Sequence, residues 1–399
     1  MKEKYFDFLE EANNIKDTII NWRRDFHMHP ELGYEEKRTS SIIKEFLNNN
    51  RIQYTETAGT GICAVIKGKS EKTIAIRADM DALPLQDNKN CSYASQIQGK
   101  MHACGHDAHT AILLGTALIL NNMKDKLNGN VKLFFEPAEE TTGGAKIMIK
   151  EGVLQNPQVD AVIGLHVDEN INCGKVGIKK SVVNAASNPF TIKIKGKGGH
   201  GANPHTTIDP IFISASVIVN LQSIVSRELP PQHPAVLTIG SINGGTAQNI
   251  IPEEVTISGI IRTMTSEDRE YVKRRILEIT EGVTNSLRGK CEITIDESYP
   301  CLYNNDDMYD LFLHSASKIV KEDNLVKLDN PNMGVESFAY FSMERPSLFY
   351  YLGVKNEEKG IVNPAHGSLF DIDEDSLPIG VAIQCQLAVD FLNNINFKW

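Results

Sequence analysis

The sequence lacks long apolar runs and a recognisable targeting segment. No run approaches the roughly 20 apolar residues that cross a bilayer. A composition of 41% hydrophobic and 23% charged residues is ordinary for a soluble protein. The opening residues, MKEKYFDFLEEANNIKDTI, read as a charged amphipathic helix without the apolar core or cleavage site of a signal peptide. We therefore expect a cytoplasmic protein with no membrane partner.

A disulfide framework and clustered positive charge are absent too. The seven cysteines are an odd number without framework spacing, which favours a reducing compartment. Lys and Arg number 41 against 51 Asp and Glu, a net charge of -10, and no basic block or RNA-binding signature occurs. This balance disfavours nucleic acid as a partner. Internal repeats and low-complexity segments are not found either.

The chain length and the order of apolar segments predict two domains. At 399 residues the chain exceeds the usual size of one hydrophobic core. In the first part, the runs GICAVIKG, KTIAIRADM, NVKLFFEP and VDAVIGLHV alternate with helical segments around residues 40–47, 110–123 and 144–151. This pattern is α/β and predicts a mixed central sheet flanked by helices.

The order of elements changes between about residues 185 and 298. There the strand PFTIKIKG, a helix, the strands AVLTIGSI and EVTISGIIRTM, a second helix and the strand KCEITIDES follow one another. The order β-α-β-β-α-β is that of a ferredoxin-like unit. The chain then returns with the strand SLFYYLG and a closing helix. We assign residues 1–184 and 299–399 to one discontinuous domain and residues 185–298 to an inserted α+β satellite domain.

Residues 101–110, MHACGHDAHT, concentrate metal-binding side chains directly before the apolar run AILLGTALIL. In irregular backbone, Cys104 and His106 can both turn to one side, and a thiolate with an imidazole suits a transition metal. We expect His102 and His109 to pack or to support a ligand instead. The alternative for this motif alone is a structural thiol beside helix-capping polar groups.

Two adjacent acids follow the predicted strand NVKLFFE. Glu139 and Glu140 lie at its carboxyl end, where α/β sheets collect their ligands. Adjacent side chains diverge, so one carboxylate can hold a metal while its neighbour acts as general base. Such a pair is otherwise common at the solvated start of a helix, but the apolar lead-in and the Gly pair behind it favour a functional role here.

Further polar residues follow other predicted strands. His166 ends AVIGLHV, and His366 lies in the loop NPAHGS. Each could be a satisfied core residue, but separate strand ends that supply Cys, His, Glu and His favour a metal centre. Asp79 and Asp81 share one face of the strand end RADMDALP. We expect Asp81 to orient a ligating histidine through a hydrogen bond; the alternative is an acidic turn that closes the strand.

The chain resembles the amidohydrolase branch of the M20 metallopeptidases in seven motifs. They occur in order along nearly the whole chain: RRDFHMHPELGYEE, IAIRADMDALPL, MHACGHDAHT, EPAEETTGGAKIMI, GGHGANPH, AQNIIPEE and NPAHGSLFD. The branch contains N-acyl-amino-acid amidohydrolases, hippurate hydrolases and auxin-conjugate hydrolases. The resemblance implies two divalent metal ions, zinc, manganese, cobalt or nickel, in the discontinuous catalytic domain. It also implies a satellite domain that often forms dimers.

The resemblance implies roles for particular residues. Its ligand positions fall on five of them: Cys104, His106, Glu140, His166 and His366. Its base position falls on Glu139. His200 falls where a family histidine polarises the scissile carbonyl, and Asn249 falls where substrate is contacted. Arg262, on the following strand, is a candidate carboxylate clamp because guanidinium binds carboxylate in a bidentate fork.

One motif departs from the branch. Where Gly-x-Glu-Asp-Phe is common, the sequence reads GVESF, which keeps Glu336 and places Ser337 at the position of the acid. The metal ligands are unaffected by this change, whereas the local lining, and with it the acyl preference, is expected to differ.

We therefore expect a metal-dependent amidohydrolase that converts N-acyl amino acids into a carboxylic acid and a free amino acid. Glu139 would take a proton from water and return it to the leaving amine, while His200 would stabilise the oxyanion. The alternatives are a dipeptidase or carboxypeptidase, a cysteine hydrolase that uses Cys104, and an inactive metal- or ligand-binding protein. The surplus of ligands disfavours the cysteine hydrolase, and the retention of Glu139 disfavours the inactive protein.

We also expect a homodimer, or a homotetramer, formed through the satellite domain. The Gly-flanked turn that carries His200 could project this side chain into the active site of a neighbouring subunit. The alternative is that His200 only caps its turn.

Overall fold

The structure is a computed structural model that describes residues 6–393, and its contacts divide the chain into two units. Unit 1 contains the described residues up to Val183, residues 303–330 and those from Ser337 onward. Unit 2 contains Asn184–Leu302 together with Pro331–Glu336. The sequence pattern gave no sign that residues 331–336 belong to the inserted unit. They do so because the Ala185 amide donates to the Asn332 carbonyl at 3.0 Å.

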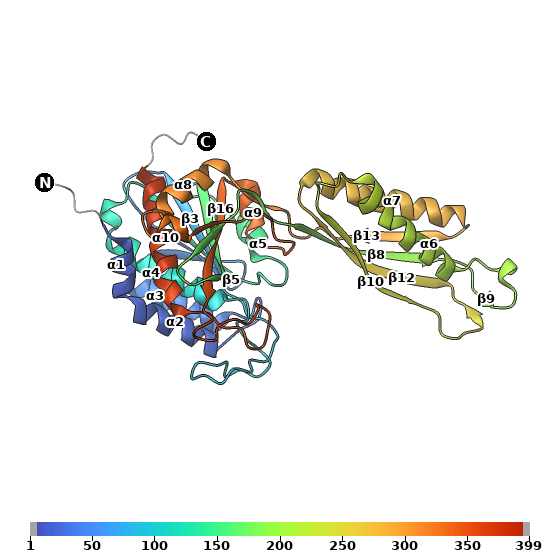
Figure 1. Ribbon diagram of the computed structural model, residues 1–399, viewed down its shortest axis with the longest axis horizontal. Helices are drawn as coiled ribbons and strands as arrows, with labels where there is room; N and C mark the ends of the chain where they lie inside the picture. Colours follow the sequence, from blue (N-terminus) through green and yellow to red (C-terminus); the bar gives the residue numbers. More distant parts are fainter. Residues whose placement is uncertain (1–5, 394–399) are drawn as a thin grey trace. The chain divides into compact units, whose positions relative to one another are not determined.

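Unit 1 is built on an eight-stranded mixed sheet (Figure 1). Its strands, in spatial order, are β1 (Gln53–Thr57), β2 (Gly61–Ile66), β4 (Asn130–Glu136), β3 (Thr73–Asp79), β5 (Ala161–Asn172), β16 (Ser347–Lys355), β6 (Val176–Ile178) and β15 (Leu325–Lys327). The central strands β4, β3, β5 and β16 run parallel to their neighbours in this group. Their carboxyl ends therefore meet at one edge of the sheet, where ligands bind in α/β folds.

Helices cover both faces of this sheet. They are α1 (Phe8–Asn14), α2 (Lys16–Met28), α3 (Lys37–Asn49), α4 (His106–Asn122), α5 (Gly144–Lys150), α8 (Asp306–Ala316), α9 (Ala339–Glu344) and α10 (Leu377–Asn393). Figure 1 shows α4 and α10 on one side of the sheet and α5 and α9 on the other. Every residue of β3 and β4 is buried between these layers, as is typical of parallel strands covered on two faces.

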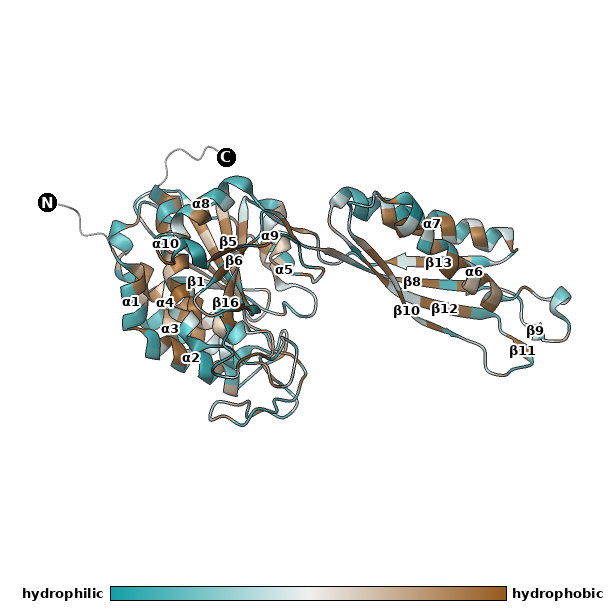
Figure 2. Ribbon diagram, in the orientation of Figure 1, coloured by the Kyte–Doolittle hydropathy of each residue, from teal (hydrophilic) through white to brown (hydrophobic). Residues whose placement is uncertain are grey.

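Unit 2 is a four-stranded antiparallel sheet with two helices. Its elements, in chain order, are β8 (Ala186–Lys195), α6 (Pro210–Ser223), β10 (Ala235–Gly244), β12 (Glu254–Thr263), α7 (Ser266–Ser286) and β13 (Lys290–Ile295). The spatial order β10-β12-β8-β13 is that of the predicted ferredoxin-like unit. Apolar side chains of the strands and of α6 and α7 form its core. In Figure 2 the ribbon of these strands is brown along much of its length, while much of α7 is teal.

Two short strand pairs complete the fold. β9 (Gly199–His200) pairs with β11 (Ile250–Ile251) beyond one end of the sheet of unit 2, and β7 (Ser181–Asn184) pairs with β14 (Leu302–Asn304).

One helical segment departs from the expectation about apolar runs. Residues 210–228, α6 and its short continuation, form the one described segment that is long and apolar enough to cross a membrane by length and composition alone. Its inward residues, among them Ile213 and Val217, pack into the core of unit 2. Its outward residues Phe212 and Val219 are 60% and 72% exposed. The expectation that no run approaches this length is therefore wrong for α6.

Candidate metal centre and active site

The turn before α4 brings together the first two predicted ligands. Gly105 has φ +87°, and a Cβ atom placed there would lie 2.3 Å from Val167 Cγ2, so only glycine fits without strain. The turn directs Cys104 and His106 to the same space, where Cys104 Sγ lies 3.3 Å from His166 Nε2. Donor atoms of Cys104, His106 and His166 all lie within 4.8 Å of one another.

The turn after β4 presents the two adjacent acids. Ala138 has φ +55°, a conformation that is costly for a residue with a side chain and that recurs at functional sites. The Glu139 and Glu140 amides donate to the two oxygens of Asp81 at 2.9 and 3.0 Å. The Ala138 amide donates to Glu36 Oε1 at 2.8 Å. Other carboxylates thus bind the backbone of this turn, while donor atoms of Glu139, Glu140 and His106 lie within 4.8 Å of one another.

The last predicted ligand, His366, also has a strained backbone. Its φ is +61°, and its amide donates to the Ala103 carbonyl at 2.7 Å, which ties its loop to the turn before α4. His366 Nε2 lies 3.3 Å from Glu140 Oε1, and His106 Nε2 lies 3.9 Å from the same oxygen. Cys104, Glu140 and His366 thus form a second group of three donors within 4.8 Å, and this group shares Cys104 with the first.

These residues fit a pair of metal ions. Nε2 of His106 is buried without a hydrogen-bond partner among the described residues. Unpartnered buried polar atoms are rare in proteins and call for a ligand or water. Sulfur, imidazole and carboxylate donors together suit a transition metal.

The charges of the site favour a cation as well. Burial raises the pKa of the Cys104 thiol well above its usual value, and the carboxylate of Glu140 raises it further. Burial also opposes the ionisation of Glu140, but the neighbouring His366 and His106 outweigh it and lower its pKa to about 2. A divalent cation would offset the cost of a buried thiolate, because a coordinating thiol is deprotonated by the metal.

Asp81 lies where the sequence predicted an orienting residue. Its Oδ1 atom is 3.3 Å from His106 Nδ1. The sequence did not reveal its contacts to the amides of Glu139 and Glu140, since these depend on how β3 and β4 lie side by side.

The two supporting histidines differ in their surroundings. His109 Nδ1 lies 2.6 Å from Asp79 Oδ1, and Nε2 accepts the Val167 amide at 2.9 Å, so neither nitrogen is available to a metal. Burial lowers the pKa of His109 to about 4, which keeps the ring neutral. His102 is buried, and its nitrogens have no hydrogen-bond partner among residues 6–393.

The position of His166 along its strand is a correction. The sequence placed it at the end of β5, but β5 continues to Asn172. β5 is longer because it pairs with β16 beyond the point, at Gly164, where its pairing with β3 ends. His166 still reaches the site, since it lies just past the last residue paired with β3.

Of the three residues of unit 2 with predicted roles, His200 and Asn249 lie together and Arg262 lies apart. His200 on β9 is paired with Ile250 on β11, and the Gly201 amide donates to the Asn249 carbonyl at 2.8 Å. Arg262 lies toward the other end of β12, paired with Ser187. The eight residue-to-residue steps from Glu254 to Arg262 span about 26 Å of extended strand.

The side chains of His200 and Arg262 are both open to further contacts. His200 is exposed, and its Nδ1 accepts the Ala202 amide at 3.1 Å, so Nε2 carries the proton of the neutral ring. This is the turn-capping contact that was the alternative for His200, and it leaves Nε2 as a donor. One guanidinium nitrogen of Arg262 is buried without a hydrogen-bond partner among the described residues. Among residues 6–393, Arg262 forms no ion pair.

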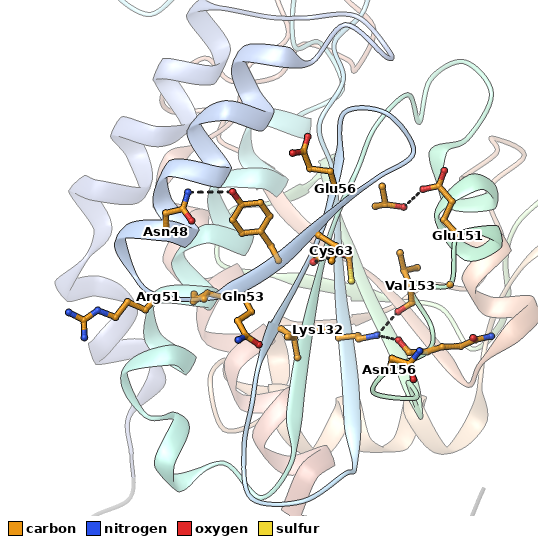
Figure 3. A pocket seen from close by; sticks show the side chains of 16 residues that line it. Asn48, Arg51, Gln53, Glu56, Cys63, Lys132, Glu151, Val153 and Asn156 are labelled. Atoms are coloured by element: carbon orange, nitrogen blue, oxygen red, sulfur yellow. Dashed lines mark hydrogen bonds between the residues drawn. The ribbon is translucent and has the colours of Figure 1, made fainter.

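A separate cavity of about 920 Å³ lies in unit 1 (Figure 3). Residues of β1 and β2, Lys132 of β4 and the segment after α5 line it. Lys132 donates to the Val153 carbonyl at 2.8 Å, and Cys63 faces the same space. None of the predicted site residues lines this cavity.

Comparison with known proteins identifies the family. The family model described as peptidase family M20/M25/M40 matches residues 75–390. The chain belongs to this family. The predictions of the M20 family, of an α/β fold with an inserted ferredoxin-like unit and of a hydrolase that acts on amide bonds are confirmed. The residue roles remain predictions.

Individual relatives span nearly the whole chain. Thermostable carboxypeptidase 1 of Saccharolobus solfataricus is 38% identical over 97% of this chain and 100% of its own length. The N-acetyl-L-cysteine deacetylase of Bacillus subtilis is 40% identical over 92% of this chain and 88% of its own. The YXEP protein of Bacillus subtilis, described as a dinuclear metal binding peptidase from the M20 family, superposes with a TM-score of 0.82. It is 32% identical and covers 96% of this chain and 100% of that chain.

Proposed function

We propose that the protein is a two-metal amidohydrolase that cleaves the amide bond of N-acyl amino acids. The observation that carries this proposal is the pair of three-donor groups that share Cys104, with Glu139 beside them. The YXEP protein, described as dinuclear, supports a pair of ions, and the B. subtilis deacetylase supports an N-acyl amino acid as substrate.

Five residues would hold the ions: Cys104, His106, Glu140, His166 and His366. Bound divalent ions, with zinc, manganese, cobalt or nickel as candidates, would act as Lewis acids on the substrate carbonyl and on water. Asp81 orients His106 and fixes the backbone of the turn that carries the acids.

Glu139 acts as the general base. The residue is 8% exposed, and its Oε1 accepts the Ser337 amide at 2.9 Å, which holds the carboxylate beside His106 and Glu140. After attack on the carbonyl carbon, the protonated Glu139 donates to the leaving amine.

Unit 2 supplies contacts to the substrate. Nε2 of His200 donates to the oxyanion, and Asn249 contacts the substrate beside it. Arg262, a cation without a counter-ion among the described residues, binds the carboxylate of the amino acid.

The second candidate function is peptide-bond hydrolysis from the carboxyl end. The S. solfataricus carboxypeptidase, which aligns over its whole length, favours it. Arg262 would hold the terminal carboxylate of a peptide in the same way. The two functions therefore differ in the group on the acyl side of the scissile bond.

The protein acts as a homodimer formed through unit 2. The outward face of α6 is an apolar stripe that includes Ile211, Phe212 and Val219, all exposed in the single chain. β10 lies at the edge of its sheet and presents unpaired backbone groups. Two copies related by a two-fold axis would cover both features. A homotetramer would need a further surface.

A cytoplasmic location is part of the same proposal. All seven cysteines are free, which agrees with a reducing compartment.

A metal-depleted preparation tests the proposed function. Exhaustive chelation should abolish the hydrolysis of acetyl- and benzoyl-amino acids, and divalent metal should restore it. A parallel assay with dipeptides decides between the two candidate functions by kcat/KM. Full activity of protein shown to be metal-free by elemental analysis contradicts the proposal.

A further inference from the structure

We propose that Ser337 is a positioning residue that fixes the carboxylate of Glu139. This inference rests on the proposed function, in which Glu139 is the base. Ser337 reaches Glu139 through its amide and is itself anchored through its hydroxyl.

The amide contact is buried. Ser337 has no exposed surface, and its N–H donates to Glu139 Oε1 at 2.9 Å. A hydrogen bond to a carboxylate that is shielded from water is among the stronger ones in proteins. It fixes one oxygen of Glu139 and so determines where the other points.

The hydroxyl contact anchors Ser337 to a cluster of buried charges. Ser337 Oγ donates to Glu136 Oε1. The other oxygen of Glu136 pairs with Arg77 Nε at 2.6 Å, and Arg77 also pairs with Asp79 Oδ2 at 2.6 Å. None of these side chains is exposed. β3 and β4 hold this cluster rigidly. The hydroxyl of Ser337 is therefore bound to an immobile group, while its amide is bound to Glu139.

A neutral donor suits this position. The cluster already contains two carboxylates, Asp79 and Glu136, against one guanidinium, Arg77. Arg77 Nη2 lies 3.5 Å from Ser337 Oγ, so an aspartate at residue 337 would be a third buried carboxylate sharing this one guanidinium, which is costly without a further cation. The serine that departs from the Gly-x-Glu-Asp-Phe pattern thus holds Glu136 without adding charge.

The first test compares three variants by kcat, KM and bound metal. Ser337→Ala removes the anchor and should lower kcat about tenfold, the worth of one hydrogen bond, with KM and metal content unchanged. Ser337→Thr keeps the hydroxyl and should stay within about twofold of wild type. Ser342→Ala is the matched control, because that hydroxyl donates to the Ala339 carbonyl of α9 at 2.9 Å, away from Glu136 and Glu139. Wild-type kcat in Ser337→Ala overturns the proposal.

The second test asks whether Ser337 acts through Glu139. Glu139→Asp shortens the side chain and breaks the contact with the Ser337 amide. In that background, Ser337→Ala should change kcat by less than about twofold. An equal loss in both backgrounds overturns the proposal. If Ser337→Ala does not fold, Ser337→Cys, which has the weaker thiol donor, replaces it with the same expectations.

A third measurement needs no turnover. Loss of the acceptor in Glu139→Ala should speed hydrogen exchange of the Ser337 amide by about tenfold or more, and unchanged exchange overturns the proposal. If the wild-type protein hydrolyses neither N-acyl amino acids nor peptides, the proposed function is wrong. The exchange measurement still shows whether the Ser337 amide is bound to Glu139, so the two failures can be told apart.

Discussion

At the residue scale, the buried carboxylates around the turn after β4 have two distinct tasks. Glu36 and Asp81 accept backbone amides of residues 138–140, and Glu136 accepts the Ala145 amide at 2.6 Å. These three acids hold the backbone. Glu139 and Glu140 point their carboxylates toward the metal-binding donors instead. The turn therefore separates acids that build the site from acids that act in it.

This division predicts different effects for the two adjacent acids. Glu139→Gln removes a proton acceptor but no ligand, so bound metal should be retained while kcat falls by about 100-fold or more. Glu140→Gln should lower metal occupancy, since it weakens one ligand. Elemental analysis of both variants, together with kcat at saturating metal, checks the assignment. The roles are exchanged if occupancy falls in Glu139→Gln and survives in Glu140→Gln.

Cys63 gives a prediction about pH that is independent of the metal site. Burial raises the pKa of this thiol from 9.0 to about 11, and the nearby Lys132 only partly opposes the shift. The thiolate is the reactive form, so at pH 8 Cys63 should react with iodoacetamide about a hundredfold more slowly than in the unfolded chain. The rate should increase as the pH rises toward 11.

Peptide mapping of alkylated protein measures this rate. Cys91, which is partly exposed, serves as the internal reference. Equal labelling of Cys63 in folded and urea-unfolded protein would contradict the shift.

At the element scale, the position of α4 depends on the turn at Gly105 that precedes it. Gly105 lets the chain enter the helix at φ +87° while Val167 packs against the turn. Gly105→Ala adds a Cβ atom that lies 2.3 Å from Val167 Cγ2. We expect a loss of about 1–3 kcal/mol in the free energy of unfolding and weaker metal binding, because Cys104 and His106 flank the strained position.

The control is a glycine with room for a side chain. Gly282 lies in α7, and a Cβ atom there meets nothing within 4 Å. Gly282→Ala should raise the free energy of unfolding by about 0.5–1 kcal/mol. Urea denaturation of both variants checks the pair of expectations, and an unfolding midpoint in Gly105→Ala equal to that of wild type contradicts the role of the turn.

Elements of this fold are predictable where the sequence pattern is strong. The fully buried strands β3 and β4 and the run AILLGTALIL of α4 are found where the sequence placed them. The extent of β5 was not predictable, because its pairing with β16 depends on a strand almost 200 residues later in the chain. The contacts of Asp81 and Ser337 with the acidic turn escaped prediction for the same reason, since the register between distant segments sets them.

At the scale of the whole molecule, the geometry of unit 2 constrains how it can serve the active site. His200 and Asn249 lie beyond one end of its sheet, and Arg262 lies toward the other. The intervening strand spans about 26 Å, which is longer than an N-acyl amino acid. Both groups of one chain therefore cannot contact the same substrate molecule. If His200 and Arg262 both act, two copies of the chain must contribute to each site.

Mixing two inactive variants tests this arrangement. His200→Ala lacks the oxyanion donor, and Glu139→Gln lacks the base. Suppose that His200 acts across the interface. In a mixed dimer, the active site of the chain that keeps Glu139 is then completed by the intact His200 of its partner. One complete site then forms, and random mixing of equal amounts should restore about a quarter of wild-type activity per chain. If His200 serves its own chain, every site lacks one group and the mixture stays inactive.

Subunit exchange must be shown separately, because dimers that do not exchange would also remain inactive. Tagged copies of the two variants, co-purified after mixing, report the fraction of mixed dimers. Phe212→Asp on the exposed stripe of α6 is the structural control: a charge buried in the interface should prevent dimers and abolish complementation while leaving unit 1 folded. Proven exchange without recovered activity rules out the contribution of His200 across subunits, and a monomeric but fully active wild-type protein rules out the need for a dimer.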